Sequence, residues 1–174
     1  MLGVREWIPV STSPKGRLAL AAVREFGARP FDEVTVAELA TAARVTTGAL
    51  YHHFGSKLGL YAFVREDVER RLLDRMEGAV AAGPESDRSA AVSAALLVGL
   101  DFAVREGFLR ILGDPPVGTE DRLAAMLSES AAPVLGRVLA AAWRAALAAV
   151  AEGAEPEHAR AAVAALRLHL PDGR

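Results

Sequence analysis

The sequence has no cysteine among its 174 residues, and only 6% of its residues are aromatic. Without cysteine the chain can form neither a disulfide framework nor a thiolate zinc site, and it has no thiolate nucleophile. The net charge is only −2, so no overall excess of one sign indicates a partner. The lack of cysteine is typical of a reducing compartment, and we expect a cytoplasmic protein.

A long hydrophobic run without charges is also lacking. The most apolar stretch, Ala131 to Ala151, has Arg137 and Arg144 in its interior, so we expect it to be buried in protein and not in lipid. The first residues, Met1 to Val10, lack the basic segment followed by an apolar run that marks a secretion signal. We therefore expect no membrane partner.

Alanine supplies much of the 52% hydrophobic content. Because alanine is the best helix former, this composition predicts an all-α chain, and we find no strand pattern. Charge is unevenly divided: residues 1–58 contain seven Lys and Arg against five Asp and Glu, whereas residues 59–174 contain thirteen against seventeen. We expect an N-terminal domain at 1–58, mildly basic, and an acidic C-terminal domain at 59–174.

Capping residues and helix breakers divide the chain into helices. Ser13 before Pro14 is a helix start, and Thr35 with Glu38 has the spacing of a capping box. A long fourth helix is expected to end at Gly83-Pro84. The last helix is expected to end near His169. The expected helix starts are Ser13, Thr35, Thr46, Ser56, Ser86, Thr119, Ala132 and Pro156.

Two short helices in the N-terminal domain have the spacing of a helix-turn-helix. They are expected at about Val36–Ala43 and Thr47–His53, joined by a three-residue turn around Arg44. In this motif the second helix presents its N-terminal side chains to base edges in the major groove. Its outward residues, followed by Lys57, include hydroxyl, phenol and imidazole groups that can donate to phosphates. This pattern predicts sequence-specific DNA binding between Thr35 and Lys57.

Three segments carry a resemblance to a known family: Val34–Ala40, Val45–Phe54 and Ser56-Lys57. Together they resemble the TetR family of transcriptional regulators, and the likeness is strong over about residues 13–64. The resemblance implies an all-helical homodimer whose N-terminal three-helix domains bind double-stranded, palindromic operator DNA. It also implies a long helix leading to a C-terminal domain that binds a small-molecule effector.

The resemblance also implies residue roles. Thr35 and Lys57 would contact phosphates, the Tyr-His-His cluster would contact phosphates or the groove, and the three residues from Thr47 would read bases. Arg44 stands where the family usually has glycine, so it must adopt an unusual backbone angle or alter the turn, and it could reach a phosphate. The expected DNA contacts are Thr35, Arg44, Thr46, Thr47, Gly48, Ala49, Tyr51, His52, His53 and Lys57.

The last two helices predict a dimer interface. Arg137 and Arg144 are seven apart and share one face, so the other faces of that helix are apolar or small. Arg160 and Arg167 are also seven apart, and the last helix has apolar residues on another face. Two such helices from each of two chains suit a four-helix bundle, although both helices could instead complete the core of a monomer. The expected interface residues are Leu135, Leu139, Ala142, Ala146, Val163 and Leu166.

The effector pocket implied by the resemblance would lie among the middle helices. Apolar side chains can line a pocket or simply pack the core, and sequence alone does not separate these roles. The candidate pocket residues are Phe63, Met76, Leu96, Leu100, Phe102, Phe108, Leu112, Met126 and Trp143.

No enzyme chemistry is indicated. Glu155 and His158 have a spacing found in di-iron bundles, but the sequence holds no second copy of the pair. We expect no catalytic residues, no metal and no cofactor. The leading hypothesis is a ligand-responsive repressor, not an enzyme. The alternatives are a helical small-molecule-binding protein or enzyme with a vestigial DNA-binding domain, and a protein-protein adaptor.

Overall fold

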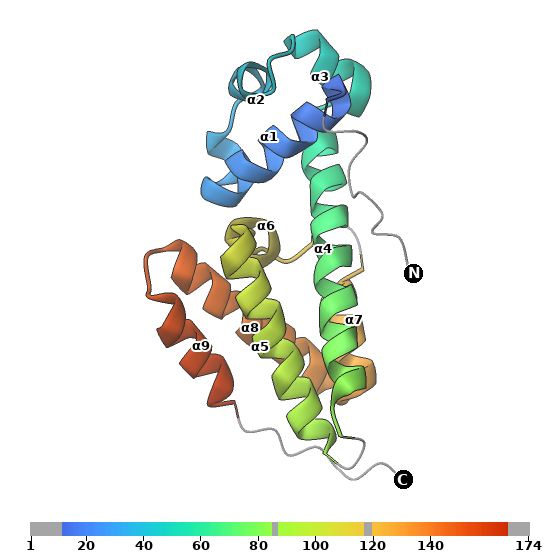
Figure 1. Cartoon of the computed structure of the whole chain (residues 1–174), viewed down its shortest axis with the longest axis vertical. Helices are drawn as coiled ribbons and strands as arrows, with labels where there is room; N and C mark the ends of the chain where they lie inside the picture. Colours follow the sequence, from blue (N-terminus) through green and yellow to red (C-terminus); the bar gives the residue numbers. More distant parts are fainter. Residues whose placement is uncertain (1–11, 85–86, 117–119, 167–174) are drawn as a thin grey trace. The chain divides into compact units, whose positions relative to one another are not determined.

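The chain folds into helices throughout the described residues, which are 12–84, 87–116 and 120–166. In this computed structural model these ranges contain nine α-helices, one short 3-10 helix and no strand (Figure 1). The all-α prediction is confirmed. Backbone contacts divide the chain into an N-terminal unit, Met1–Val68, and a C-terminal unit, Glu69–Arg174. The functional division expected at residue 58 stays a prediction, and the packing divides ten residues later.

The N-terminal unit is a small bundle in which α1, α2 and α3 contact one another. Its core lies where these helices and the first turns of α4 bury aliphatic side chains, including Leu18, Leu39, Leu50 and Leu60. Its elements are α1 (Pro14–Ala28), η1 (Phe31–Glu33), α2 (Val36–Ala42), α3 (Thr47–Phe54) and the first part of α4 (Lys57–Ala82).

Three expected capping residues begin helices in this unit. The Ser13 hydroxyl oxygen accepts a hydrogen bond from the Gly16 amide at 3.0 Å, which opens α1. Thr35 and Glu38 form both bonds of the capping box at the start of α2. Thr46 opens α3 by accepting from the Ala49 amide at 3.2 Å. These local signals therefore fix the starts of α1, α2 and α3.

The C-terminal unit is arranged around α8. This helix contacts α5, α6, α7 and α9, and α5 also contacts α9. The buried indole of Trp143 in α8 donates a hydrogen bond to the backbone oxygen of Leu96 in α5 at 3.0 Å, so the two helices are tied at mid-length. With the rest of α4, the unit contains α5 (Arg88–Glu106), α6 (Leu109–Gly113), α7 (Arg122–Ser130), α8 (Pro133–Ala151) and α9 (Pro156–Ala164).

Small residues let helices in this unit approach closely. A Cβ atom on Gly136 of α8 would overlap the backbone nitrogen and the hydroxyl of Ser128 in α7. A Cβ on Gly99 of α5 would lie 2.8 Å from the sulfur of Met76 in α4. Glycine is needed at Gly136, where the clash is with backbone, whereas at Gly99 the side chain of Met76 would have to shift to admit a Cβ atom.

Several boundaries differ from the expected ones. The expected starts at Ser86 and Thr119 and the expected end at His169 lie outside the described residues. The caps of α5 and α7 are instead Asp87 and Asp121, each accepting from the amide three residues on. The last helix is shorter than expected because α9 ends at Ala164. The five-residue α6 was not predicted, since so short a helix has no periodic pattern to reveal it.

Among the described helices, α8 is long and apolar enough by length and composition to be considered as a membrane span, with a mean hydropathy of 1.6. Its Arg144 side chain is only 9% exposed and forms a two-pronged ion pair with Asp121, with both N–O distances at 2.7 Å. An arginine neutralised by a carboxylate at the start of α7 favours a helix packed within a folded unit.

Candidate nucleic-acid interface

The capping box at the start of α2 shares its glutamate, Glu38, with an ion pair on the surface of the unit. Thr35 donates to the Glu38 carboxylate from its hydroxyl and from its backbone amide, each at 2.7 Å. Arg29 donates to the same carboxylate at 3.0 Å and to Glu25 at 2.7 Å. The Thr35 hydrogen bond, followed by that of Arg29, lowers the pKa of Glu38 to about 2. Because the Thr35 hydroxyl hydrogen is engaged by Glu38, contact with a phosphate would require it to change partner.

The turn between α2 and α3 contains an arginine in a left-handed conformation. Arg44 has φ 55°, the only positive φ of a non-glycine residue in the described chain. Its amide donates to the Thr41 oxygen at 3.0 Å, and the Val45 amide donates to the Ala40 oxygen at 2.9 Å. These two bonds form the Schellman motif, which usually has glycine at the left-handed position. The unusual backbone angle expected at Arg44 is confirmed.

Helix α3 has one buried face and one polar, exposed face. Leu50 is fully buried and holds the helix in the unit, whereas Tyr51 is 53% exposed. The side chain of His53 is half-buried, and its ring centroid lies 5.0 Å from that of the exposed His52. The residues that the sequence predicts as base-reading are at the free start of the helix: Thr47 and Gly48 are exposed and Ala49 is half-buried. The predicted contacts from Thr46 to His53 therefore share one short helix and its cap.

Lys57, at the start of α4, has a different environment from that expected. Its ammonium group donates to the backbone oxygens of Phe31 and Val34, both at 2.9 Å, and lies 4.1 Å from the centre of the Phe31 ring. The ammonium group therefore bonds the backbone oxygen of the first residue of η1 and that of the residue just after η1. Lys57 is half-buried. Sequence spacing gave no signal of this role, because the partners lie more than twenty residues away. Phosphate binding by Lys57 stays a prediction that would compete with these bonds.

The predicted effector residues are divided between the two units. Phe63 belongs to the N-terminal unit, where its ring centroid lies 5.3 Å from that of Phe54. The other eight are all buried in the C-terminal unit, and Phe102 and Phe108 pack edge to face at 5.4 Å. Phe63 therefore belongs to a different unit from the remaining candidates, which are Met76, Leu96, Leu100, Phe102, Phe108, Leu112, Met126 and Trp143.

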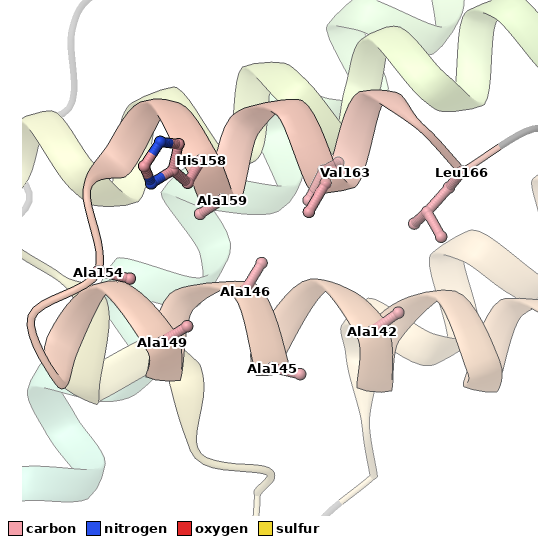
Figure 2. Close-up of a pocket in the computed structure, with 10 residues that line it drawn as sticks. Ala142, Ala145, Ala146, Ala149, Ala154, His158, Ala159, Val163 and Leu166 are labelled. Atoms are coloured by element: carbon pink, nitrogen blue, oxygen red, sulfur yellow. The ribbon is translucent and has the colours of Figure 1, made fainter.

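The described chain has an apolar groove at a different place, between α8 and α9. It encloses about 380 Å³ and is lined mostly by alanine, with His158 at one end. Figure 2 shows Ala146 of α8 and Val163 of α9 directed into the space between the two helices. Four of the six predicted interface residues line this groove: Ala142, Ala146, Val163 and Leu166.

The exposed apolar stripe of α8 is displaced by one residue from the predicted interface. Leu139 is buried within its own chain, and Leu135 is half-buried. Val134 and Val138 are instead 64% and 56% exposed, and the exposed Ala141 and Ala145 continue the same face. Sequence reasoning missed this stripe because nearly every position of the helix is apolar or small, so the pattern does not fix its rotation.

Comparison with known proteins addresses the N-terminal unit directly. The family model described as "Bacterial regulatory proteins, tetR family" matches residues 19–63, which span α1 to the first turns of α4. Residues 19–63 therefore form a tetR-family domain. The exposed α3, the second helix of the helix-turn-helix, lies within the matched residues, and the resemblance stated from the motif is confirmed.

Curated relatives match a longer part of the chain. Nucleoid occlusion factor SlmA of Alteromonas mediterranea is 34% identical over 102 residues, covering 58% of this chain and 51% of the relative. The protein of the same name from Idiomarina loihiensis is 34% identical over 113 residues, covering 64% and 56%. That from Shewanella sp. (strain MR-4) is 34% identical over 101 residues, covering 57% and 50%. The chain thus spans about half the length of these relatives.

Proposed function

We propose that this chain is a sequence-specific DNA-binding transcriptional regulator, a cytoplasmic repressor that a small-molecule effector releases from a palindromic operator. The exposed polar face of α3 carries the proposal. Leu50 holds the helix in the unit while Thr47, Tyr51 and His52 face outward. A helix supported on one side with hydroxyl, phenol and imidazole groups on the other suits docking in a major groove.

The roles proposed for individual residues follow from position along α3. Thr47 to Ala49 would face base edges, and the small Gly48 permits close approach of the backbone to the groove. Tyr51, His52 and His53, further along the helix, would contact phosphates. Since Thr47 has the only polar side chain of the base-reading segment, operator shape would contribute to specificity.

A homodimer is part of this proposal. The exposed stripe of Val134, Val138, Ala141 and Ala145 on α8 borders the groove between α8 and α9. Burying this stripe against the same stripe of a second copy would remove large exposed apolar side chains from water. Two copies would also present two α3 helices to the two halves of a palindrome.

The dimer is tested by placing charge on the stripe. Val134→Glu with Val138→Glu should give a monomer in light scattering at micromolar concentration, because four carboxylates would meet across the interface. Val98→Glu, at another exposed valine, is the matched control and should remain dimeric. A wild-type monomer at that concentration would contradict the dimer.

The proposed effector would bind in the C-terminal unit. Its candidate residues, apart from Phe63, form a closely packed core, so binding a ligand among them would require the core to rearrange. Such a rearrangement would favour a dimer whose two α3 helices no longer match successive major grooves. A ligand screen monitored by release of bound DNA tests this step.

DNA binding itself is tested by selecting fragments from random double-stranded DNA with the full chain at low salt. We expect a palindrome whose half-site centres lie about 10 base pairs, or a multiple of that, apart. Tyr51→Ala should weaken binding more than Tyr51→Phe, which keeps the ring and loses only the hydroxyl. Failure to select or retard any DNA would contradict the function and favour a small-molecule-binding protein with a vestigial DNA-binding domain.

A second candidate function is nucleoid occlusion, the role named for the curated relatives. It is favoured by the length of the matches, because an alignment of 113 residues is longer than the N-terminal unit and must reach into the C-terminal one. Transcript profiling of a deletion strain separates the two candidates. A repressor requires some transcript to rise, whereas nucleoid occlusion alone predicts unchanged transcripts and altered placement of septa relative to the nucleoid.

A further inference from the structure

The cationic side chains of the N-terminal unit are mostly engaged within the protein. Among its described residues, Arg17 donates to the Ala43 oxygen at 3.0 Å, and Arg29 bonds two carboxylates. Lys57 donates to two carbonyl groups. Lys15 lies 4.9 Å from the centre of the Phe63 ring, and Arg65 donates to the Tyr61 hydroxyl at 3.3 Å.

Two arginines of the described part of this unit differ from the rest. Arg24 and Arg44 are both exposed, and neither side chain forms a hydrogen bond, ion pair or ring contact with another described residue. Arg24 lies on α1 two turns, or about 10 Å, beyond Arg17. Since Arg17 contacts Ala43 at the end of α2, Arg24 is displaced along α1 from the turn that leads into α3. Arg44 lies in that turn, two residues before Thr46, the cap of α3.

The backbone at Arg44 gives a second reason to assign it a role. A left-handed φ is unfavourable for any residue with a Cβ atom, and glycine would remove that cost. The strained turn is nevertheless held firmly, by the Schellman bonds and by the Arg17 bond to the Ala43 oxygen. Strain at an exposed position that gains no internal contact is typical of a residue kept for an external partner.

We propose that Arg44 is a principal phosphate anchor of the DNA interface, binding the operator backbone beside the base pairs that face Thr47. The inference rests on the proposed function. A guanidinium group suits this role because it can bind a phosphate through two parallel hydrogen bonds. Because Arg44 lies next to the cap of α3, this contact would fix how deeply α3 enters the major groove and which base pairs it faces. Lys57 is instead bonded to the backbone oxygens of Phe31 and Val34.

The test compares Arg44→Gly, Arg44→Lys and the control Arg24→Ala on a selected operator across a salt series. Arg44→Gly should raise the melting temperature by about 2 °C, because glycine relieves the left-handed strain. The same variant should bind about tenfold more weakly, and its dependence of log affinity on log salt should be shallower by about one for each bound subunit. Arg44→Lys should keep the wild-type salt dependence, and Arg24→Ala should change affinity by less than about twofold.

The outcomes are distinguishable. If the wild type binds no selected DNA, the proposed function fails and the anchor with it. If the wild type binds and Arg44→Gly shows the same affinity and salt dependence, only the anchor is overturned. If Arg44→Gly loses affinity for some operator sequences and not others, with an unchanged salt dependence, Arg44 reads a base and the phosphate assignment is wrong.

Discussion

The two units of this chain are both helical, but they are specified in different ways. In the N-terminal unit α1, α2 and α3 each begin at a side-chain cap, at Ser13, Thr35 and Thr46. In the C-terminal unit α5 and α7 are capped by Asp87 and Asp121, but α6, α8 and α9 begin without a side-chain cap. Their positions depend on contacts between helices, such as that of Gly136 with Ser128. Local sequence therefore determines much of the first unit, and tertiary packing much of the second.

The largest effect is expected from Trp143→Ala in the C-terminal unit. The side chain is fully buried, and its indole bonds the Leu96 oxygen across two helices. Removing it should lower the free energy of unfolding by about 4 kcal/mol, measured in a urea titration. Trp143→Phe keeps most of the volume and loses the hydrogen bond, so a smaller loss is expected. A loss below about 1 kcal/mol for the alanine variant would show that α8 does not organise its unit.

A smaller effect is expected from Gly136→Ala. The added methyl would overlap the backbone of Ser128, so α7 and α8 would have to separate, at a cost of about 2 kcal/mol. The matched control is Gly78→Ala in α4, where nothing lies within 4 Å of the added atom. That control should stabilise by about 1 kcal/mol, because alanine is the better helix former. Equal effects of the two substitutions on thermal unfolding would contradict the close crossing.

The smallest effect is expected in the N-terminal unit, where the stability contributed by Glu38 depends on pH. The folded pKa of Glu38 is lowered from 4.5 to about 2, so its ionised form stabilises the fold above about pH 4.5. That contribution is lost as pH falls from there through about 2. Glu38→Gln should therefore be less stable than wild type near neutrality, and the difference should shrink on acidification. Melting temperatures of both proteins measured at several pH values check this. A difference independent of pH would contradict the ionic role of the capping box.

Prediction from sequence was more accurate for the N-terminal unit than for the C-terminal unit, because it detects local contacts and not distant ones. The caps of α1, α2 and α3 were predicted because each depends on residues only three apart. The rotation of α8 was not predicted, since a helix rich in alanine buries almost any face equally well. The engagement of Lys57 by two distant carbonyl groups also had no sequence signal, because such contacts exist only once the unit has folded.

The candidate site was predicted in part. The motif located α3 and its exposed polar residues, and it indicated the unusual conformation of Arg44. It did not show which cations are already engaged, and this distinction separates Arg44 from Lys57. Motif position gives the elements of a DNA-binding domain, whereas the availability of each side chain for DNA requires the packed structure.

The hydrogen bond between Trp143 and the Leu96 oxygen also has a spectroscopic consequence. The sequence contains two tryptophans, so Trp7→Phe would leave Trp143 as the sole indole emitter. An indole shielded from water fluoresces at short wavelength, and this one joins α5 to α8. Any ligand that separates those helices would expose the ring and shift its emission to the red. The protein therefore contains an intrinsic optical probe of its C-terminal unit, and this probe needs neither DNA nor an added label.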